Sequence, residues 1–232
     1  MKFALRLIFL LFTIHCSLFT FSQTDATALI EKVKSKLDKV NDYTATGILK
    51  TDVAFIKAPV SKVTVYFKKP SHFRLAKNGG ISVLPKGGVS VNMSTVISTN
   101  NFTALDAGEA IINKTKTRII KLLPNDENSD VVLSTLYIDE ADLLILKAIT
   151  TTRENGTYEV TMFYGKYADY GLPDKVIFSF NAKDYKLPKG ITLDFDEEKP
   201  PDAEKLKNKK GKVEIDYSSY TINKGVDDSV FK

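Results

Sequence analysis

Apolar residues recur along the chain with two different periods, which separate a helical beginning from a strand-rich remainder. In the first part the apolar positions are three or four residues apart, with charged positions between them: Leu29, Ile30, Val33, Leu37 and Val40. This spacing places the apolar side chains along one stripe of a helix. The pattern therefore predicts an amphipathic helix that begins near Asp25 and ends at about Val40.

After residue 42 the period of the apolar positions changes to two, which is typical of strands. Val63, Val65 and Phe67 alternate with polar residues until Pro70 ends the run. Similar runs, several of them separated by turn residues, occupy residues 43–56, 72–75, 89–97, 117–123, 131–138, 143–152, 160–164, 176–180, 191–195 and 213–217. The less regular segment 100–113 could hold a short helix over residues 104–110. Together these patterns predict a mainly β (α+β) fold, an antiparallel sheet with one apolar face covered by the N-terminal helix.

One segment of the strand-rich part is too charged to be buried. Residues 197–212 contain Pro200-Pro201 and six lysines. A segment of this composition is expected to form a solvated loop between two strands. A role of the lysines at a membrane surface is the alternative interpretation.

The first 22 residues resemble a secretory signal peptide. Lys2 and Arg6 precede an apolar run over residues 7–21, and small residues lie before a cleavage site at Ser22/Gln23. Cleavage there leaves residues 23–232 as one exported domain in the periplasm, without a transmembrane span. A membrane anchor is the first alternative, but the run is shorter than a span requires. The second alternative is acylation at Cys16, for which the preceding His15 is a poor fit.

Residues 23–232 contain no cysteine and a single histidine, His72. Zinc sites normally use several His or Cys ligands, and no nucleophile motif accompanies His72. The acidic residues of segment 194–198 lack the spacing and central glycine of an EF-hand loop. We therefore expect no catalytic residues, no metal site, no cofactor and no enzymatic activity. The net charge of the full chain is +5 and falls to +3 for residues 23–232, since Lys2 and Arg6 are removed; this small charge is spread along the chain, which argues against a nucleic-acid partner.

Two segments resemble the beginning of LolA-type outer-membrane lipoprotein carriers. The first is Leu37-Asp38-Lys39-Val40 followed by Tyr43, and the second runs from Phe67 through Lys68-Lys69-Pro70 to Arg74. More loosely, residues 164–176 and 220–231 resemble periplasmic lipoprotein-sorting homologues. The chain departs from the family at residues 84–88, which lack the family's usual Asp-Gly segment, and at Lys69, where the family often has arginine.

The resemblance implies an unclosed barrel with short lid helices over an apolar cavity. It implies that the cavity binds lipoprotein acyl chains or another lipid, supplied by an inner-membrane lipoprotein-release transporter. The expected cavity residues are Val63, Val65, Phe67, Leu29 and Val33. The family also implies that Lys69 acts as a latch that holds the lid shut through hydrogen bonds to lid backbone. The alternative function is a protein-interaction or envelope-stress sensing module on the same fold.

Overall fold

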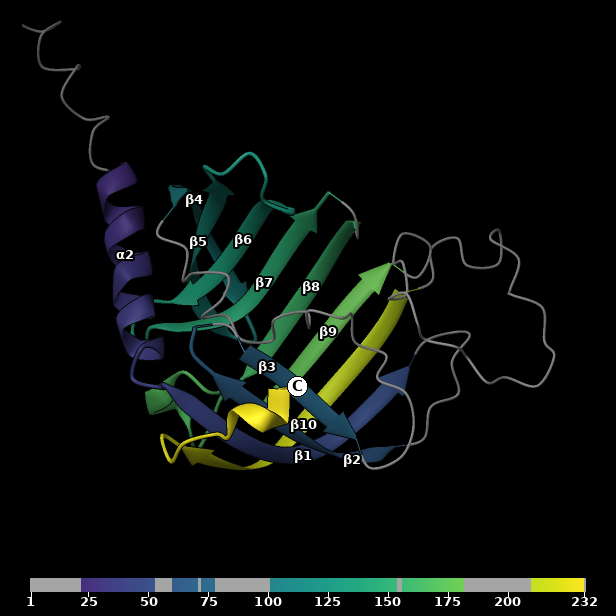
Figure 1. The fold of residues 1–232 in the computed structure, drawn as a ribbon. Coiled ribbons are helices and arrows are strands. Elements are labelled where there is room, and N and C mark those ends of the chain that lie inside the picture. The colour runs from purple at the N-terminus through teal and green to yellow at the C-terminus, as the bar shows by residue number, and fades with distance from the viewer. Residues whose placement is uncertain are drawn as a thin grey trace, which may run out of the picture.

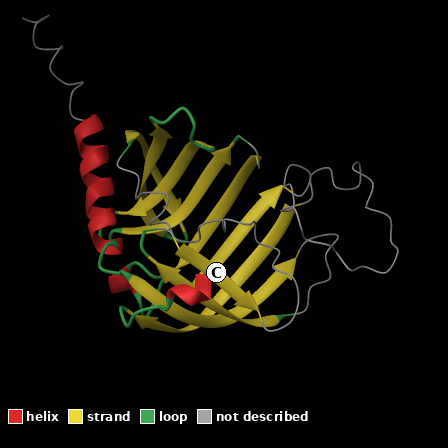
Figure 2. Ribbon diagram, viewed as in Figure 1, coloured by secondary structure: helices red, strands yellow, loops and turns green. Residues whose placement is uncertain are grey.

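The predicted antiparallel sheet is the main element of the structure, a computed structural model. It describes residues 22–52, 60–70, 72–77, 101–153, 156–181 and 210–231. Within these residues the sheet has ten strands (Figures 1 and 2). They are β1 (Asp42–Asp52), β2 (Ser61–Lys68), β3 (His72–Lys77), β4 (Phe102–Ile112), β5 (Thr115–Pro124), β6 (Val131–Asp139), β7 (Leu144–Thr152), β8 (Gly156–Phe163), β9 (Lys175–Asn181) and β10 (Lys210–Ile222).

The strand order makes the sheet an open half-barrel. The order is β3-β2-β1-β10-β9-β8-β7-β6-β5-β4, and every neighbouring pair is antiparallel. The sheet curves strongly, so that β1 to β3 turn across in front of β9 and β10 (Figure 1). Strands β3 and β4 are the two edges and do not pair with each other. The predicted fold class, an antiparallel sheet curved into an unclosed barrel, is confirmed.

Alternation along the strands gives the sheet an apolar inner face and a charged outer face. On β9 the inner residues Val176, Phe178 and Phe180 are buried, and the residues between them are half-buried. On the outer face Glu214 of β10 forms ion pairs with Lys50 of β1 and Lys175 of β9, with N–O distances of 3.3 and 2.9 Å. Water solvates the outer charges, so only the inner face needs a cover.

The cover includes the predicted helix, α2 (Ser22–Leu37). It packs along the edge strand β4 and buries Ile30 and Val33 completely (Figure 1). The helix ends at Leu37, three residues earlier than predicted, but Val40 is still buried beneath the turn that leads into β1. Within the described residues, no helix is both long and apolar enough to cross a membrane.

Two expectations about particular segments are wrong. Residues 104–110 belong to strand β4, since they pair with β5 from Phe102 to Ile112, with a bulge between Asp106 and Glu109. Asn113 and Lys114 close this hairpin with φ angles of 50° and 71°. The predicted loop 197–212 ends before Lys210, because β10 begins there and Lys212 forms an ion pair with Glu214 on the outer face.

Short 3-10 helices accompany the sheet in the described residues. η2 (Ala168–Tyr170) contacts α2, and η3 (Asp228–Phe231) contacts the edge strand β3. The signal peptide predicted for residues 1–22 lies outside the described residues, except that α2 begins at Ser22. The predicted turns and strands at residues 78–97 and 191–195, and the loop as far as residue 209, also lie outside them.

Candidate functional site

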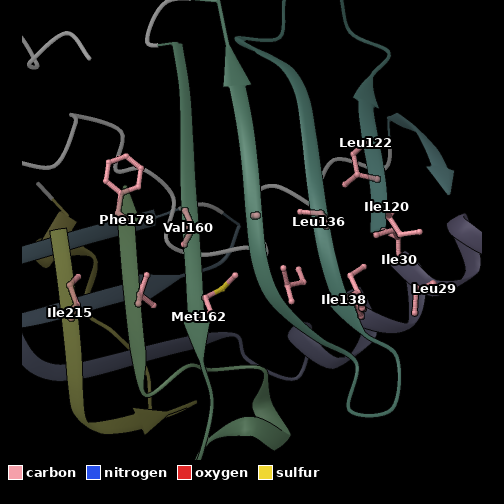
Figure 3. Packing of buried hydrophobic residues seen from close by; sticks show 14 of the residues in the cluster. Leu29, Ile30, Ile120, Leu122, Leu136, Ile138, Val160, Met162, Phe178 and Ile215 are labelled. Atoms are coloured by element: carbon pink, nitrogen blue, oxygen red, sulfur yellow. The ribbon is translucent and has the colours of Figure 1, made fainter. Parts of the chain in front are cut away.

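The inner face of the half-barrel carries one continuous group of buried apolar side chains, here called the main cluster. Its sheet residues come from β1, β2 and β4 to β10, and nearly all are aliphatic. Figure 3 shows part of it: Ile120, Leu122, Leu136, Ile138, Val160, Met162, Phe178 and Ile215 point to the same side of their strands. Burial of these apolar side chains stabilises the fold by about 0.8 kcal/mol per CH₂.

Helix α2 supplies the facing wall of the main cluster. Leu29 and Val33, both predicted as cavity residues, are buried in it with Ala26 and Ile30. Figure 3 shows Leu29 and Ile30 beside Ile120. The helical spacing of three and four residues brings these side chains onto one stripe, which is why the sequence pattern identified them.

The three predicted cavity residues on β2 divide between two clusters. Val63, Val65 and Phe67 lie on one face of the strand, and all are buried. Val63 belongs to the main cluster, whereas Val65 and Phe67 belong to a second one. This aromatic cluster consists of Val40, Tyr43, Ala45, Val65, Phe67 and Leu172, with Phe73, Leu75, Tyr167, Tyr217, Tyr220 and Ile222 packed against it.

Four tyrosines and one phenylalanine form the centre of the aromatic cluster. The ring of Tyr43 lies 5.3 Å from that of Phe67 and 5.4 Å from that of Tyr220, centroid to centroid. Tyr220 in turn lies 4.9 Å from Tyr167 and 5.1 Å from Tyr217. These separations are typical of attractive aromatic pairs. The rings therefore form one contiguous group.

The hydroxyl groups of these tyrosines differ in their partners. The Tyr220 hydroxyl donates to the Pro173 carbonyl oxygen at 2.7 Å, and the Tyr167 hydroxyl accepts from the Tyr220 backbone N–H at 3.3 Å. Within the described residues, no hydrogen bond reaches the hydroxyl of Tyr43 or Tyr217. Burial raises the pKa of the Tyr43, Tyr217 and Tyr220 phenols, so all three stay neutral and keep their protons as donors.

A row of polar side chains also crosses the inner face of the sheet, from β6 through β7 to β8. Ser134 of β6 and Thr150 of β7 are register partners whose buried hydroxyls lie 3.0 Å apart. Tyr158 of β8 is the next partner in the same row, and burial raises the pKa of its phenol despite a hydrogen bond with Thr150. This row satisfies its polar groups internally, which is the usual state of buried hydroxyls.

Lys69, the predicted latch, lies at the end of α2. Its ammonium donates to the Asp38 carbonyl oxygen at 2.8 Å and pairs with the Asp38 carboxylate at 3.1 Å. Desolvation of the Asp38 carboxyl, which opposes ionisation, is outweighed by hydrogen bonds and charge from Lys69 and Lys34, so its pKa is lowered. A cation at this position also complements the negative end of the helix dipole.

The sequence predicts no metal site and no catalytic residues, and the side chains in the described segments that bear on this expectation are the acidic residues and His72. No group of three or more His, Cys, Asp or Glu side chains there could hold a metal ion. His72 is exposed at the beginning of β3, and its ring packs 5.4 Å from that of Phe231 in η3. This histidine therefore helps to hold the C-terminal segment against the edge strand.

Sequence reasoning named Leu29, Val33 and Val63 of the main cluster. It also named Val65 and Phe67 of the aromatic cluster, but none of the tyrosine rings of that cluster as site residues. Tyr167 lies in a loop before η2, and Tyr217 and Tyr220 come from a distant strand. For Tyr217 and Tyr220, the signal in the sequence is that the spacing of two from Ile215 to Tyr217 changes to three from Tyr217 to Tyr220. A search for regular alternation does not detect this change.

Comparisons with solved structures place this fold beside lipoprotein-sorting proteins. A LolA superfamily protein from Nitrosomonas europaea is 10% identical, with a TM-score of 0.56 over 89% of this chain and 97% of its own. A putative outer membrane lipoprotein-sorting protein domain from Vibrio parahaemolyticus is 11% identical, with a TM-score of 0.52 over 90% and 97%. A DUF1329 family protein from Desulfovibrio piger is 12% identical, with a TM-score of 0.54 over 92% and 98%.

Sequence comparison adds no nearer relative, because no family model and no curated protein matches the chain. At these identities the structural matches establish the fold. The chain has the open half-barrel architecture of LolA superfamily proteins and lipoprotein-sorting domains.

Proposed function

We propose that this protein is a periplasmic carrier that binds the acyl chains of lipoproteins, or of a related lipid, on the inner face of its half-barrel. The observation that carries the proposal is the main cluster: a nearly unbroken set of buried, mostly aliphatic side chains on the inner face across β5 to β10, walled by Leu29, Ile30 and Val33 of α2. The fold shared with LolA superfamily proteins and lipoprotein-sorting domains supports the same function.

The physical basis of carriage is the transfer of acyl chains from water to this surface. Each buried methylene contributes about 0.8 kcal/mol, so a chain of about 15 methylenes gains roughly 12 kcal/mol, which is comparable to the cost of association of about 4–15 kcal/mol. Binding and release of this kind need no cofactor and no catalytic group. The proposed donor of the cargo is an inner-membrane lipoprotein-release transporter, and the proposed compartment is the periplasm, reached through cleavage near Ser22/Gln23.

Lys69 has a proposed role in loading. Its bonds to Asp38 join the hairpin of β2 and β3 to the end of α2, the helix that walls the main cluster. Because the ammonium is strongly hydrated and lacks the planar fork of arginine, we propose a latch that opens more readily than an arginine latch. Movement of α2 would then accompany the entry of cargo.

The carrier proposal is tested by native mass spectrometry of the protein purified from its own cell envelope. The expected result is a population that retains acylated lipid or lipopeptide and loses it to an added triacylated lipopeptide. A second assay measures binding of a fluorescent fatty acid and its displacement by the same lipopeptide. Protein that carries no lipid, and binds the probe no better than an unrelated β-sheet protein, would favour the interaction-module alternative.

Two matched variants locate the binding surface. Ala148 is buried on the inner face of β7, and Thr161 is its half-buried neighbour on the outer face of β8. Ala148→Phe adds volume to the main cluster and is expected to weaken binding of the fatty-acid probe about tenfold, whereas Thr161→Phe leaves it unchanged. A thermal melt of each variant confirms that the fold is retained, since overpacking also destabilises. If both variants bind the fatty-acid probe with equal affinity, the probe does not bind at the main cluster.

A further inference from the structure

Two phenol hydroxyl groups in the aromatic cluster have no hydrogen-bond partner among the described residues: that of Tyr43, which is buried, and that of Tyr217, which is partly buried. Tyr43 is only 5% exposed. A buried hydroxyl is normally paired with protein or with ordered water, because an unpaired one loses its hydration without compensation. These two groups therefore need an acceptor that the described residues do not supply.

The neighbouring tyrosine hydroxyls form other hydrogen bonds, and among the described residues none of them accepts from Tyr43 or Tyr217. The Tyr220 hydroxyl is bonded to the Pro173 carbonyl oxygen, and the Tyr167 hydroxyl accepts from the Tyr220 backbone. Tyr164 donates to the Ile145 carbonyl oxygen at 2.9 Å. The O–H donors of Tyr43 and Tyr217 take no part in these bonds, and within the described residues the Tyr167 hydroxyl takes part only as an acceptor.

Backbone geometry fixes Tyr217 at the junction of the two clusters. Its side chain packs against both the main cluster and the aromatic cluster. Strand β10 leaves β9 at this residue, where the Tyr217 backbone N–H donates to the Asp174 carbonyl oxygen at 2.7 Å. The partner on β1 is Gly47, where a Cβ would lie 2.6 Å from the Asp216 carbonyl oxygen, so only glycine permits this close approach.

We propose that the hydroxyl groups of Tyr43 and Tyr217 bind the first polar group of an acyl ligand, the carbonyl oxygen of its ester or amide linkage. The inference rests on the proposed function. An acyl chain lying on the main cluster reaches the aromatic cluster at Tyr217, and its carbonyl is then the atom nearest the two donors. The tyrosines would set the depth at which the chain stops.

The surroundings favour a neutral carbonyl over a carboxylate or a phosphate. In the described part of the chain, no lysine or arginine lies close enough to lower the pKa of either phenol, which burial raises. Burying a charged group without a partner of opposite charge is far more costly than burying a hydrogen-bonded carbonyl. The site therefore selects esters and amides, as found in acylated lipids and lipopeptides.

The test compares two fluorescent probes that differ in their acceptor. The methyl ester of parinaric acid has a carbonyl at the end of its chain, and diphenylhexatriene is a hydrocarbon without an acceptor. Tyr43→Phe and Tyr217→Phe are each expected to weaken ester binding about fivefold, the usual effect of one hydrogen bond, and to leave hydrocarbon binding unchanged. The matched control is Tyr220→Phe, whose lost bond is internal to the protein.

Thermal melts of the ligand-free variants give an independent readout. Removing an unpaired hydroxyl leaves the melting temperature equal or higher, so Tyr43→Phe and Tyr217→Phe should not lower it, whereas Tyr220→Phe should. Equal affinity of parent and variants for the ester overturns the inference and leaves the carrier proposal intact. Equal losses for both probes also overturn it, because they indicate a packing role. A parent protein that binds neither probe overturns the carrier proposal itself, and this inference with it.

Discussion

The side chain of Asn223 ties the last described segment to the connection between α2 and β1, and its removal should measurably destabilise the fold. Its carbonyl oxygen accepts from the backbone N–H groups of Asn41 and Asp42 at 2.7 and 3.4 Å. Its amide nitrogen donates to the Lys39 carbonyl oxygen at 2.8 Å. The residue itself has a φ of 54°, a conformation that asparagine tolerates better than alanine.

The expected loss for Asn223→Ala combines these two effects. Two short, exposed hydrogen bonds contribute about 0.5–1 kcal/mol each, and alanine with a positive φ adds about 1 kcal/mol of strain. The free energy of unfolding should therefore fall by about 2–3 kcal/mol. For a chain of this size that corresponds to a decrease in melting temperature of roughly 5–10 °C.

Two further variants separate the hydrogen bonds from the strain. Asn223→Gly removes the side chain but accepts the positive φ, so it should lose about 1 kcal/mol less than the alanine variant. Asn223→Asp keeps the acceptor and loses the donor to Lys39, so its stability should lie between those of the parent and the alanine variant. Urea unfolding of the three Asn223 variants measures the order of their free energies of unfolding, with Lys224→Ala as an exposed neighbouring control. An alanine variant within about 0.5 kcal/mol of the parent would refute the reasoning.

Three other predictions follow from single contacts. Gly47→Ala should lower the free energy of unfolding by about 1–3 kcal/mol in urea titrations, because its Cβ would lie 2.6 Å from the Asp216 backbone oxygen; a neutral result would mean that the bulge adapts freely. The ion pair with Lys175 helps to lower the pKa of Glu214 from 4.5 to about 2, so this stabilisation is complete above pH 4.5 and is lost as the pH falls through about 2. The urea midpoint of Glu214→Gln should therefore depend less on pH in this acid range than that of the parent. If the two midpoints change in parallel with pH, the proposed contribution of Glu214 is wrong. For the latch, Lys69→Leu should speed release of a fluorescent fatty acid and Lys69→Arg should slow it; three equal rates would leave Lys69 as a static cap on α2.

The alternation of apolar residues predicted most of the described strands, because each strand has one face that must be buried and one that water solvates. Val176, Phe178 and Phe180 on β9 show this directly. The helix was predicted for the same reason, since Leu29, Ile30 and Val33 share the stripe that packs on the sheet. In both cases a local pattern carries the whole signal.

Strand β4 escaped prediction because Ala104, its one buried residue, is small. Ala104 is buried where α2 packs along the strand, so a large side chain is not needed there, and alanine favours helix by intrinsic propensity. The bulge at Asp106 to Glu109, with Gly108 at a φ of 91°, interrupts the period as well. Tertiary packing therefore decided the conformation of this segment against its local preference.

The candidate site escaped prediction in part for a related reason. Strict alternation places residues three apart on opposite faces of a strand, which would send Tyr217 and Tyr220 to different sides of β10. The bulge opposite Thr46 and Gly47 inserts one residue and returns both rings to the inner face, 5.1 Å apart. The contact of Tyr220 with Tyr43 then depends on the pairing of β1 with β10, more than 170 residues apart in the chain. A pattern of apolar positions can identify the inner face on which we propose that an acyl chain lies. The tyrosine donors proposed to meet the carbonyl of that chain are positioned by a register shift that such a pattern does not contain.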